Sequence, residues 1–217
     1  MMEEEIQKEN PEEEPEPWYK GPIRWILALF LILIILSWVI PEYAVKLDPN
    51  PERIPSISEV VPKDIVVENK TTNNYLELLE PNDPVIKRAA DKIISLSECS
   101  SSKICQAKAI FYFIRDSFDY VSDPLQFEYV KSAKESLVSH NGDCDDSAVL
   151  AANLLQAIGI RTRFVFVPNH VYIEAYLPES LKRYKSEQDW VALDLTCKKC
   201  DFGELPWQTS SNKNYLE

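Results

Sequence analysis

The longest apolar run of this chain predicts a helix that crosses a membrane. Residues 23–40 read IRWILALFLILIILSWVI and contain a single charge, at Arg24. At about 1.5 Å per residue, a helix of this length spans roughly 27 Å, close to the hydrocarbon thickness of a bilayer. Tryptophan and tyrosine flank both ends of the run, as aromatic residues do at membrane interfaces. We therefore expect one transmembrane helix over 23–40, ended by Pro41.

This apolar run has two other interpretations, a buried core helix and a removed signal peptide. The run is long for a signal peptide, and no small-residue cleavage site follows it. Lys20 and Arg24 adjoin its N-terminal end. The nearest positive charges on the other side, Lys46 and Arg53, lie further away. This distribution slightly favours a cytoplasmic N-terminus and an extracytoplasmic C-terminal domain in a single-pass membrane protein.

After residue 63, apolar positions recur at helical spacing and then follow strand patterns. Helices are expected at 84–97, 103–118 and 145–158, with a short helix or turn at 131–138. Strands are expected at 161–167, 171–177 and 189–195, where β-branched and aromatic residues gather. Helices followed by a small antiparallel sheet indicate an α+β domain.

The composition of the remaining segments is typical of tails and linkers. The first 22 residues hold eight glutamates against two lysines, which predicts a disordered acidic tail. Five prolines between residues 41 and 63 predict a stiff, extended linker. The expected organisation is therefore an acidic tail at 1–22, a transmembrane helix at 23–40, a linker at 41–63, a domain at 64–207 and a C-terminal tail at 208–217.

The charge of the chain narrows the class of partner. The net charge is −12, and about half of it lies in the acidic tail. A nucleic-acid-binding protein needs a basic face to contact phosphates, so no nucleic-acid partner is expected. The lipid bilayer is the expected partner of residues 23–40.

The candidate chemistry lies in Cys144, a lone cysteine at the start of the helix expected at 145–158. The free amides and the dipole of a helix N-terminus favour the thiolate, which is the nucleophilic form. His170 opens one expected strand and Asp194 lies on the next. If these strands are neighbours, Asp194 can hold one imidazole nitrogen while the other faces the Cys144 sulfur. An inert buried cysteine is the alternative interpretation.

Three aspartates surround this cysteine and bear on its reactivity. Asp143, Asp145 and Asp146 would raise the pKa of a neighbouring thiol. We therefore expect them to cap the free amides of the helix rather than to take part in catalysis.

The run from residue 119 to about residue 206 resembles the transglutaminase-like core domain of the papain-related cysteine hydrolases and transferases. About 90 residues match in one order with short gaps, which is more specific than any single motif. The matching pieces are 120–124 (YVSDP), 142–146 (GDCDD), 159–165 (GIRTRFV), 170–176 (HVYIEAY) and 190–196 (WVALDLT).

The resemblance implies a papain-like α+β core in which the nucleophile helix packs on a small antiparallel sheet. It implies that Cys144 is the nucleophile, His170 the base and Asp194 the group that orients the base. An acyl-thioester would form on Cys144 from a peptide bond or a glutamine-type amide of a protein or peptide substrate, and water or an amine would resolve it. The Cys144 amide would contribute to an oxyanion hole, with Gln126 as a weak candidate for a further donor. A catalytically silent binding module at the membrane is the alternative function.

The other four cysteines form two close pairs, Cys99 with Cys105 and Cys197 with Cys200. Two local disulfides would suit an oxidising exterior and the proposed orientation. A single four-cysteine zinc site and free thiols are the alternatives. A redox-active CxxC motif is less favoured, because no thioredoxin-like unit surrounds it. Catalysis itself needs no cofactor in this interpretation, whereas a structural zinc remains possible.

Three further positions have ordinary interpretations. His140 stands in a turn before the nucleophile helix and is expected at the surface. Glu174 is expected to point outward from its strand. Residues 69–71 (NKT) match a glycosylation sequon, and a chance match is the favoured interpretation.

Overall fold

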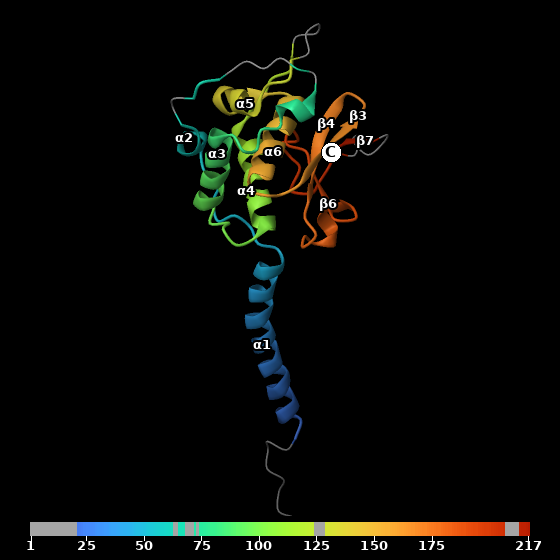
Figure 1. The fold of residues 1–217 in the computed structure, drawn as a ribbon. Helices are drawn as coiled ribbons and strands as arrows, with labels where there is room; N and C mark the ends of the chain where they lie inside the picture. The colour runs from blue at the N-terminus through green and yellow to red at the C-terminus, as the bar shows by residue number, and fades with distance from the viewer. Residues whose placement is uncertain (1–20, 63–64, 68–71, 73, 124–128, 207–212) are drawn as a thin grey trace, which may run out of the picture. The chain divides into compact units, whose positions relative to one another are not determined.

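The computed structural model describes most of the chain and divides it into two units (Figure 1). The described residues are 21–62, 65–67, 72, 74–123, 129–206 and 213–217. The first unit covers Met1–Ala44 and the second covers Val45–Glu217.

The apolar helix α1 runs over Ile23–Leu47, and its last residues belong to the second unit. Over Ile23–Ile40 the mean hydropathy is 2.6 and none of the helix is buried. By length and composition such a helix is able to cross a membrane, either as an anchor or within a signal sequence. The expectation that Pro41 ends the helix was wrong. A proline removes only one N–H donor, and α1 continues through Pro41 to Leu47.

The second unit contains a group of helices and a sheet. Its helices are α2 (Ile57–Val60), α3 (Pro84–Leu96), α4 (Lys103–Ser117), α5 (Ala133–Ser139) and α6 (Cys144–Ala157), with 3-10 turns η2 (Tyr75–Leu78) and η3 (Lys182–Tyr184). Its main strands are β3 (Thr162–Val167), β4 (His170–Tyr176), β5 (Lys185–Glu187), β6 (Trp190–Leu193) and β7 (Asn214–Leu216). They form an antiparallel sheet in the order β5-β6-β4-β3-β7. Two short parallel strands, β1 (Asp119–Tyr120) and β2 (Asn141–Gly142), pair separately.

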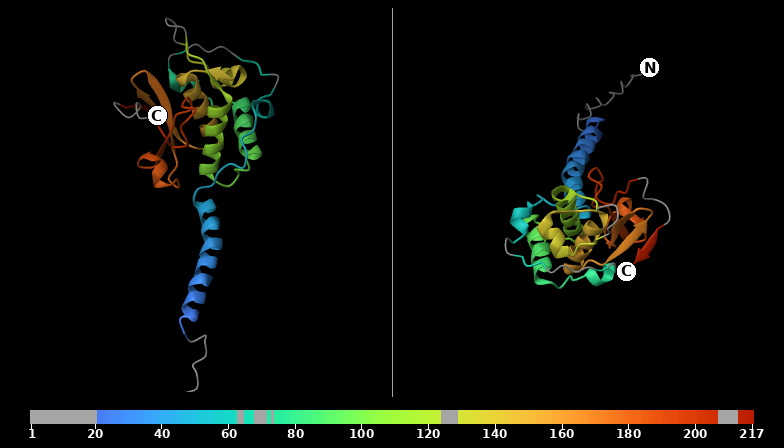
Figure 2. Two further views of the ribbon diagram at one scale, coloured as in Figure 1. Left: turned by 180° about the vertical axis from the view of Figure 1, so that it is seen from behind. Right: turned by 90° about the horizontal axis from the view of Figure 1, so that it is seen from above.

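Helix α6 lies between the sheet and the other helices. It packs against β4 and β3 on one side and against α3, α4 and α5 on the other, and Figure 2 shows the helices gathered on one side of the sheet. Its side chains Ala148, Ala151 and Ala152 are fully buried. Because alanine is small, the helix can approach the sheet closely, and this brings its N-terminus beside β4. The α+β fold predicted from the sequence is confirmed.

Capping residues explain where the predicted helices begin. Asp83 accepts a hydrogen bond from the Val85 N–H at 2.8 Å, and Pro84 occupies the first turn of α3. Ser102 and Ser132 cap α4 and α5 in the same way. The helices predicted at 84–97, 103–118, 131–138 and 145–158 are therefore confirmed, with small differences at their ends.

The segment expected to be a free linker is part of the folded unit. Val60 in α2 is fully buried in the core. Asp48 forms an ion pair with the buried Lys108 at 2.5 Å. Asp48 also accepts a hydrogen bond from the Tyr184 hydroxyl at 2.7 Å. The domain therefore begins well before residue 64. The apolar and charged side chains of this segment bind it to the domain despite its prolines.

The C-terminal residues also differ from the expected tail. Residues Asn214–Leu216 form β7, which pairs with β3 at the edge of the sheet. The opposite edge strand, β5, was likewise not predicted. Both strands have only three residues, too few for an alternating pattern to appear, and their pairing partners come from elsewhere in the chain.

Glu174 is buried, contrary to the expectation that it faces solvent. Its side chain is 0% exposed and accepts two bonds from Arg163, at 2.8 and 2.5 Å, and one from the Ser186 hydroxyl at 2.7 Å. Burial lowers the pKa of Arg163, but the bonds with Glu174 outweigh this effect and raise it. Side chains therefore cover the face of the sheet that points away from α6. The alternate residues of β4 that include Glu174 lie on this second buried face.

Candidate active site

Cys144 is the first residue of α6 and is held by a reciprocal cap. Oδ1 of Asp143 accepts the N–H groups of Asp145 at 3.1 Å and Asp146 at 3.5 Å, while Oδ2 of Asp146 accepts the Asp143 N–H at 3.3 Å. A Cβ on Gly142 would meet Asp146 atoms at 2.5 Å, so only glycine fits beside this cap. Lys131 forms an ion pair with Asp146 at 2.7 Å. Two of the three aspartates thus cap the helix as expected.

Asp145 has a different role from the expected cap. Its Oδ1 lies 3.4 Å from the Cys144 sulfur, which donates its thiol hydrogen. Its Oδ2 accepts the Tyr75 hydroxyl hydrogen at 2.7 Å. The carboxylate therefore links the cysteine to η2, almost seventy residues earlier in the chain.

The start of β4 lies beside the N-terminus of α6, where Cys144 stands. The N–H groups of β4 alternate in direction, and the Leu177 N–H donates to the Asp189 carbonyl on the β6 side. Val171 has the same parity as Leu177, so its N–H also points to the β6 side. Strand β6 ends at Leu193, before it reaches the level of Val171. The Val171 N–H instead faces the Cys144 sulfur, and this N–H acts to lower the pKa of the thiol.

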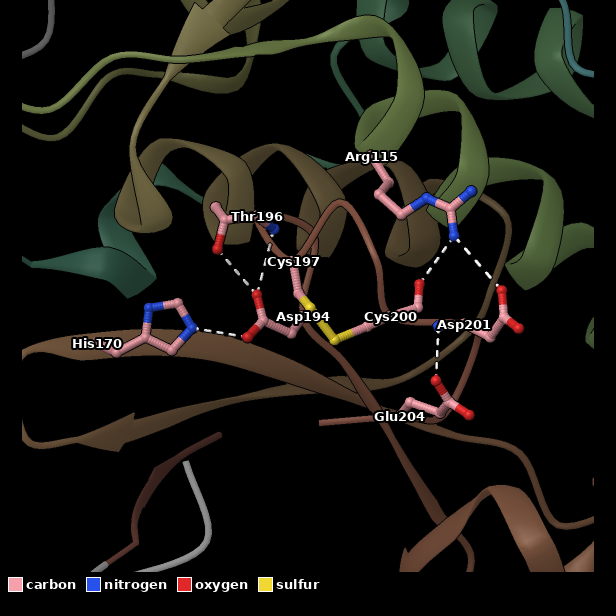
Figure 3. Close-up of a disulfide and its surroundings, with 8 residues drawn as sticks. All are labelled: Arg115, His170, Asp194, Thr196, Cys197, Cys200, Asp201 and Glu204. Atoms are coloured by element: carbon pink, nitrogen blue, oxygen red, sulfur yellow. Dashed lines mark hydrogen bonds and ion pairs between the residues drawn. A yellow bond between two sulfur atoms is a disulfide. The ribbon is translucent and has the colours of Figure 1, made fainter. Parts of the chain in front are cut away.

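His170 and Asp194 are in direct contact (Figure 3). The His170 Nε2 and the Asp194 Oδ2 are 2.9 Å apart. A carboxylate only accepts, so this contact assigns the hydrogen to Nε2 and leaves Nδ1 as the acceptor nitrogen. The Tyr172 ring stacks on the imidazole with centroids 6.3 Å apart.

Thr196 holds the other oxygen of Asp194. Oδ1 accepts the Thr196 N–H at 3.2 Å and its hydroxyl hydrogen at 2.9 Å. Burial raises the pKa of the Asp194 carboxyl, but the bonds from His170 and Thr196 outweigh it and lower the pKa below its ordinary value. The carboxylate therefore stays charged in its buried position and can orient the imidazole.

The Cys144 thiol is protonated in this arrangement. Burial is the main cause that raises its pKa to about 12, and Asp145 and Asp143 raise it further, while the Val171 N–H acts in the opposite direction. Within the described residues, no hydrogen bond joins Cys144 to His170. The Cys144 thiol therefore donates its hydrogen to Asp145 and not to the His170 imidazole.

The sequence could find some of these residues and not others. Thr196 lies two positions after Asp194, a spacing at which hydroxyl residues commonly bond an aspartate, so local sequence held a signal for it. Tyr75 and the Val171 N–H reach the cysteine only through the fold. The candidate oxyanion donor Gln126 and the sequon at 69–71 lie outside the described residues.

The remaining cysteines form two disulfides, Cys99–Cys105 and Cys197–Cys200. Cys144 is the one free cysteine, and all five are described. Of the interpretations of the cysteine pairs, the structure agrees with two local disulfides. A four-cysteine zinc site would require these sulfurs as thiolates.

Among the residues that the structure describes, one group of side chains could hold a metal ion. Single ligand atoms of Asp143, Cys144 and Asp145 lie within 4.8 Å of one another. Asp143 also caps the helix and Asp145 also binds Tyr75. A cation here would compete with these contacts.

Replacing Asp145 with asparagine is expected to make Cys144 more reactive. Removing the charge takes away one cause of the raised thiol pKa, and each unit of decrease raises the thiolate fraction about tenfold at neutral pH. The measurement is the rate of Cys144 alkylation by iodoacetamide as a function of pH, followed by peptide mass spectrometry. In Asp145→Asn this rate should begin to rise at a lower pH than in the wild type. Asp119→Asn in the exposed strand β1 is the matched control. An unchanged pH profile in Asp145→Asn would contradict this account of the thiol.

Part of this chain is similar to known proteins. Residues 90–195 match the sequence model of the Transglutaminase-like superfamily. No curated protein matches the chain. Among solved structures, Legionella pneumophila LapG is 20% identical with a TM-score of 0.41, covering 61% of this chain and 78% of LapG. Calcium-bound LapG is 22% identical with a TM-score of 0.42, covering 55% and 68%. A proposed cysteine protease from Cytophaga hutchinsonii is 18% identical with a TM-score of 0.40, covering 64% and 46%.

Proposed function

Since residues 90–195 match the sequence model of the Transglutaminase-like superfamily, we propose that this chain is a membrane-anchored cysteine enzyme of that superfamily. Cys144 is its nucleophile, His170 its base and Asp194 the group that orients the base. The observation that carries the proposal is the position of the Cys144 sulfur. It faces the main-chain N–H of Val171, the residue that follows His170, and the His170 ring is held by Asp194.

In the proposed reaction, His170 Nδ1 takes the thiol proton as the Cys144 sulfur attacks a carbonyl carbon. The carbonyl oxygen becomes an oxyanion, and its collapse expels an amine that takes the proton from His170. The product on the enzyme is an acyl-thioester. Water or a second amine then attacks it, again with His170 as the base, and the thiol is regenerated.

The Cys144 amide is the proposed oxyanion donor. Asp143 accepts the N–H groups of Asp145 and Asp146. Within the described part of the chain, the Cys144 N–H has no acceptor. A free N–H at a helix N-terminus, on the nucleophile itself, is suited to a developing negative charge.

The substrate is proposed to be a protein or peptide, and α1 is proposed to anchor the enzyme in a lipid bilayer. Two disulfides suit a domain outside the cytoplasm. The alternative function is a silent binding module of the same fold. The protonated resting state of Cys144 is compatible with either function, so the test must measure turnover.

The test is mass spectrometry of the full chain after incubation with a peptide library and a labelled primary amine. The proposal expects an acyl adduct on Cys144 and released products, with the label showing whether an amine or water resolves the thioester. Cys144→Ala should lose both signals. Absence of adduct and product in the wild-type protein, with Cys144 still alkylated by iodoacetamide, would overturn the enzyme and support the binding module.

A further inference from the structure

The Cys197–Cys200 disulfide lies three residues beyond Asp194, the group proposed to orient the catalytic base. Figure 3 shows the disulfide beside the Asp194 carboxylate, with Thr196 between them in the chain. Thr196 provides both hydrogen bonds to Oδ1 of Asp194, through its N–H and its hydroxyl. The conformation of the chain at residues 194–197 therefore determines whether Asp194 is held for His170.

This short segment is fastened at both ends. On one side Leu193 is paired within the sheet. On the other side Arg115 of α4 donates to the Cys200 carbonyl at 2.8 Å, and Lys198 donates to the carbonyls of Arg115 and Phe118. The disulfide closes the turn between these attachments, and the Cys200 N–H donates to the Cys197 carbonyl at 3.0 Å.

The two disulfides differ in their accessibility. Cys99 and Cys105 are 1% and 4% exposed and belong to the hydrophobic core. Cys197 is only partly buried and is followed by two exposed lysines. An external thiolate can therefore approach Cys197, whereas the core disulfide is shielded, and access is one of the factors that control thiol–disulfide exchange.

We propose that the Cys197–Cys200 disulfide is a site of reversible thiol–disulfide exchange that controls the Cys144 site through Thr196 and Asp194. The partner is a dithiol reductant. One of its thiolates attacks the Cys197 sulfur, and Cys200 leaves as a thiolate and takes a proton. The second thiolate attacks the mixed disulfide, Cys197 leaves and is protonated, and the reductant becomes a disulfide. Two electrons and two protons thus pass to the protein.

Reduction releases the turn that holds Thr196, so Asp194 loses donors and no longer orients His170. The inference rests on the proposed function of Cys144, His170 and Asp194. It is tested by two readouts, of which one reports the His170–Asp194 contact independently of catalysis.

The first readout is proton NMR of the imidazole N–H of His170. The chain has only two histidines, so a His140→Asn variant assigns the signals. The oxidised protein should show a slowly exchanging Nε2–H proton bonded to Asp194. After dithiothreitol treatment, with reduction of Cys197–Cys200 verified by mass, this signal should broaden or disappear, and reoxidation should restore it.

The second readout is the rate of Cys144 alkylation by iodoacetamide after the reductant is removed. Reduction should slow it by about tenfold, comparable to the loss of one hydrogen bond to a charged group. Cys197→Ser/Cys200→Ser should match the reduced wild type, and dithiothreitol should not slow it further. Near-UV circular dichroism verifies that the variant is folded.

An unchanged His170 signal and Cys144 rate after verified reduction would overturn the proposal. A further loss of rate in Cys197→Ser/Cys200→Ser on reduction would also overturn it, because the effect would then belong to Cys99–Cys105. Failure of the proposed function is a separate result. Equal Cys144 alkylation rates in the wild type and in His170→Ala would show that His170 does not act on Cys144. The NMR signal of His170 in the wild type would still show whether reduction of Cys197–Cys200 changes the His170–Asp194 contact.

Discussion

Asp194→Asn is expected to slow acyl-enzyme formation on Cys144 by about 10²–10⁴-fold, which is the typical rate contribution of a correctly oriented general base. Asparagine preserves the shape of the side chain, and its oxygen can still accept both bonds from Thr196. The amide nitrogen then faces His170 Nε2 and donates to it. The imidazole hydrogen moves to Nδ1, and this nitrogen can no longer take the thiol proton.

The measurement is the rate of adduct formation on Cys144 with a peptide identified by the library experiment. Asp189→Asn is the matched control, because Asp189 is partly exposed and pairs with Lys185 away from the site. Unfolding temperatures of both variants exclude a general loss of structure. A rate close to that of the wild type in Asp194→Asn would show that Asp194 does not orient the base.

The second prediction concerns the buried ion pair on the far face of the sheet. Arg163→Met leaves Glu174 buried without its main partner, which is expected to cost about 3–5 kcal/mol of unfolding free energy. For a domain of this size, this corresponds to a fall of about 6–20 °C in Tm, at about 2–4 °C per kcal/mol. Thermal unfolding of the full chain, followed by near-UV circular dichroism, measures the change.

Two controls separate burial from charge in this prediction. Arg53→Met removes one partner of an exposed ion pair with Glu59, and a much smaller fall in Tm is expected. Arg163→Met/Glu174→Leu removes both buried charges and should recover most of the lost stability. A single variant as stable as the wild type would show that solvent reaches Glu174 or that Lys213, 3.8 Å away, is a sufficient partner.

The contrast between α6 and β7 shows which parts of the fold the sequence could predict. Helix α6 has a capping aspartate, a run of apolar residues and a terminating glycine, and all of these signals are local. Strand β7 has three residues and exists because β3 offers its edge. Helix α2 and Asp48 were assigned to a linker for the same reason, since their partners Lys108 and the core lie far along the chain.

The candidate site divides in a similar way. Cys144, His170, Asp194 and the capping aspartates could be named from residue type and position alone. The role of Asp145 could not, because its second partner, Tyr75, comes from a distant turn. Glu174 was misassigned because strand alternation separates two faces without showing whether the second is covered.

By itself, the sequence determined the apolar helix, the order of helices and central strands, and the residue types of a cysteine site, since periodicity, capping and motif spacing are local properties. Only the tertiary structure decided how these parts act together. It ended β6 early enough for the Cys144 sulfur to face the Val171 N–H, paired His170 with Asp194, and joined the four remaining cysteines into two disulfides. These outcomes depend on which distant segments pack together, and that packing is a property of the whole chain.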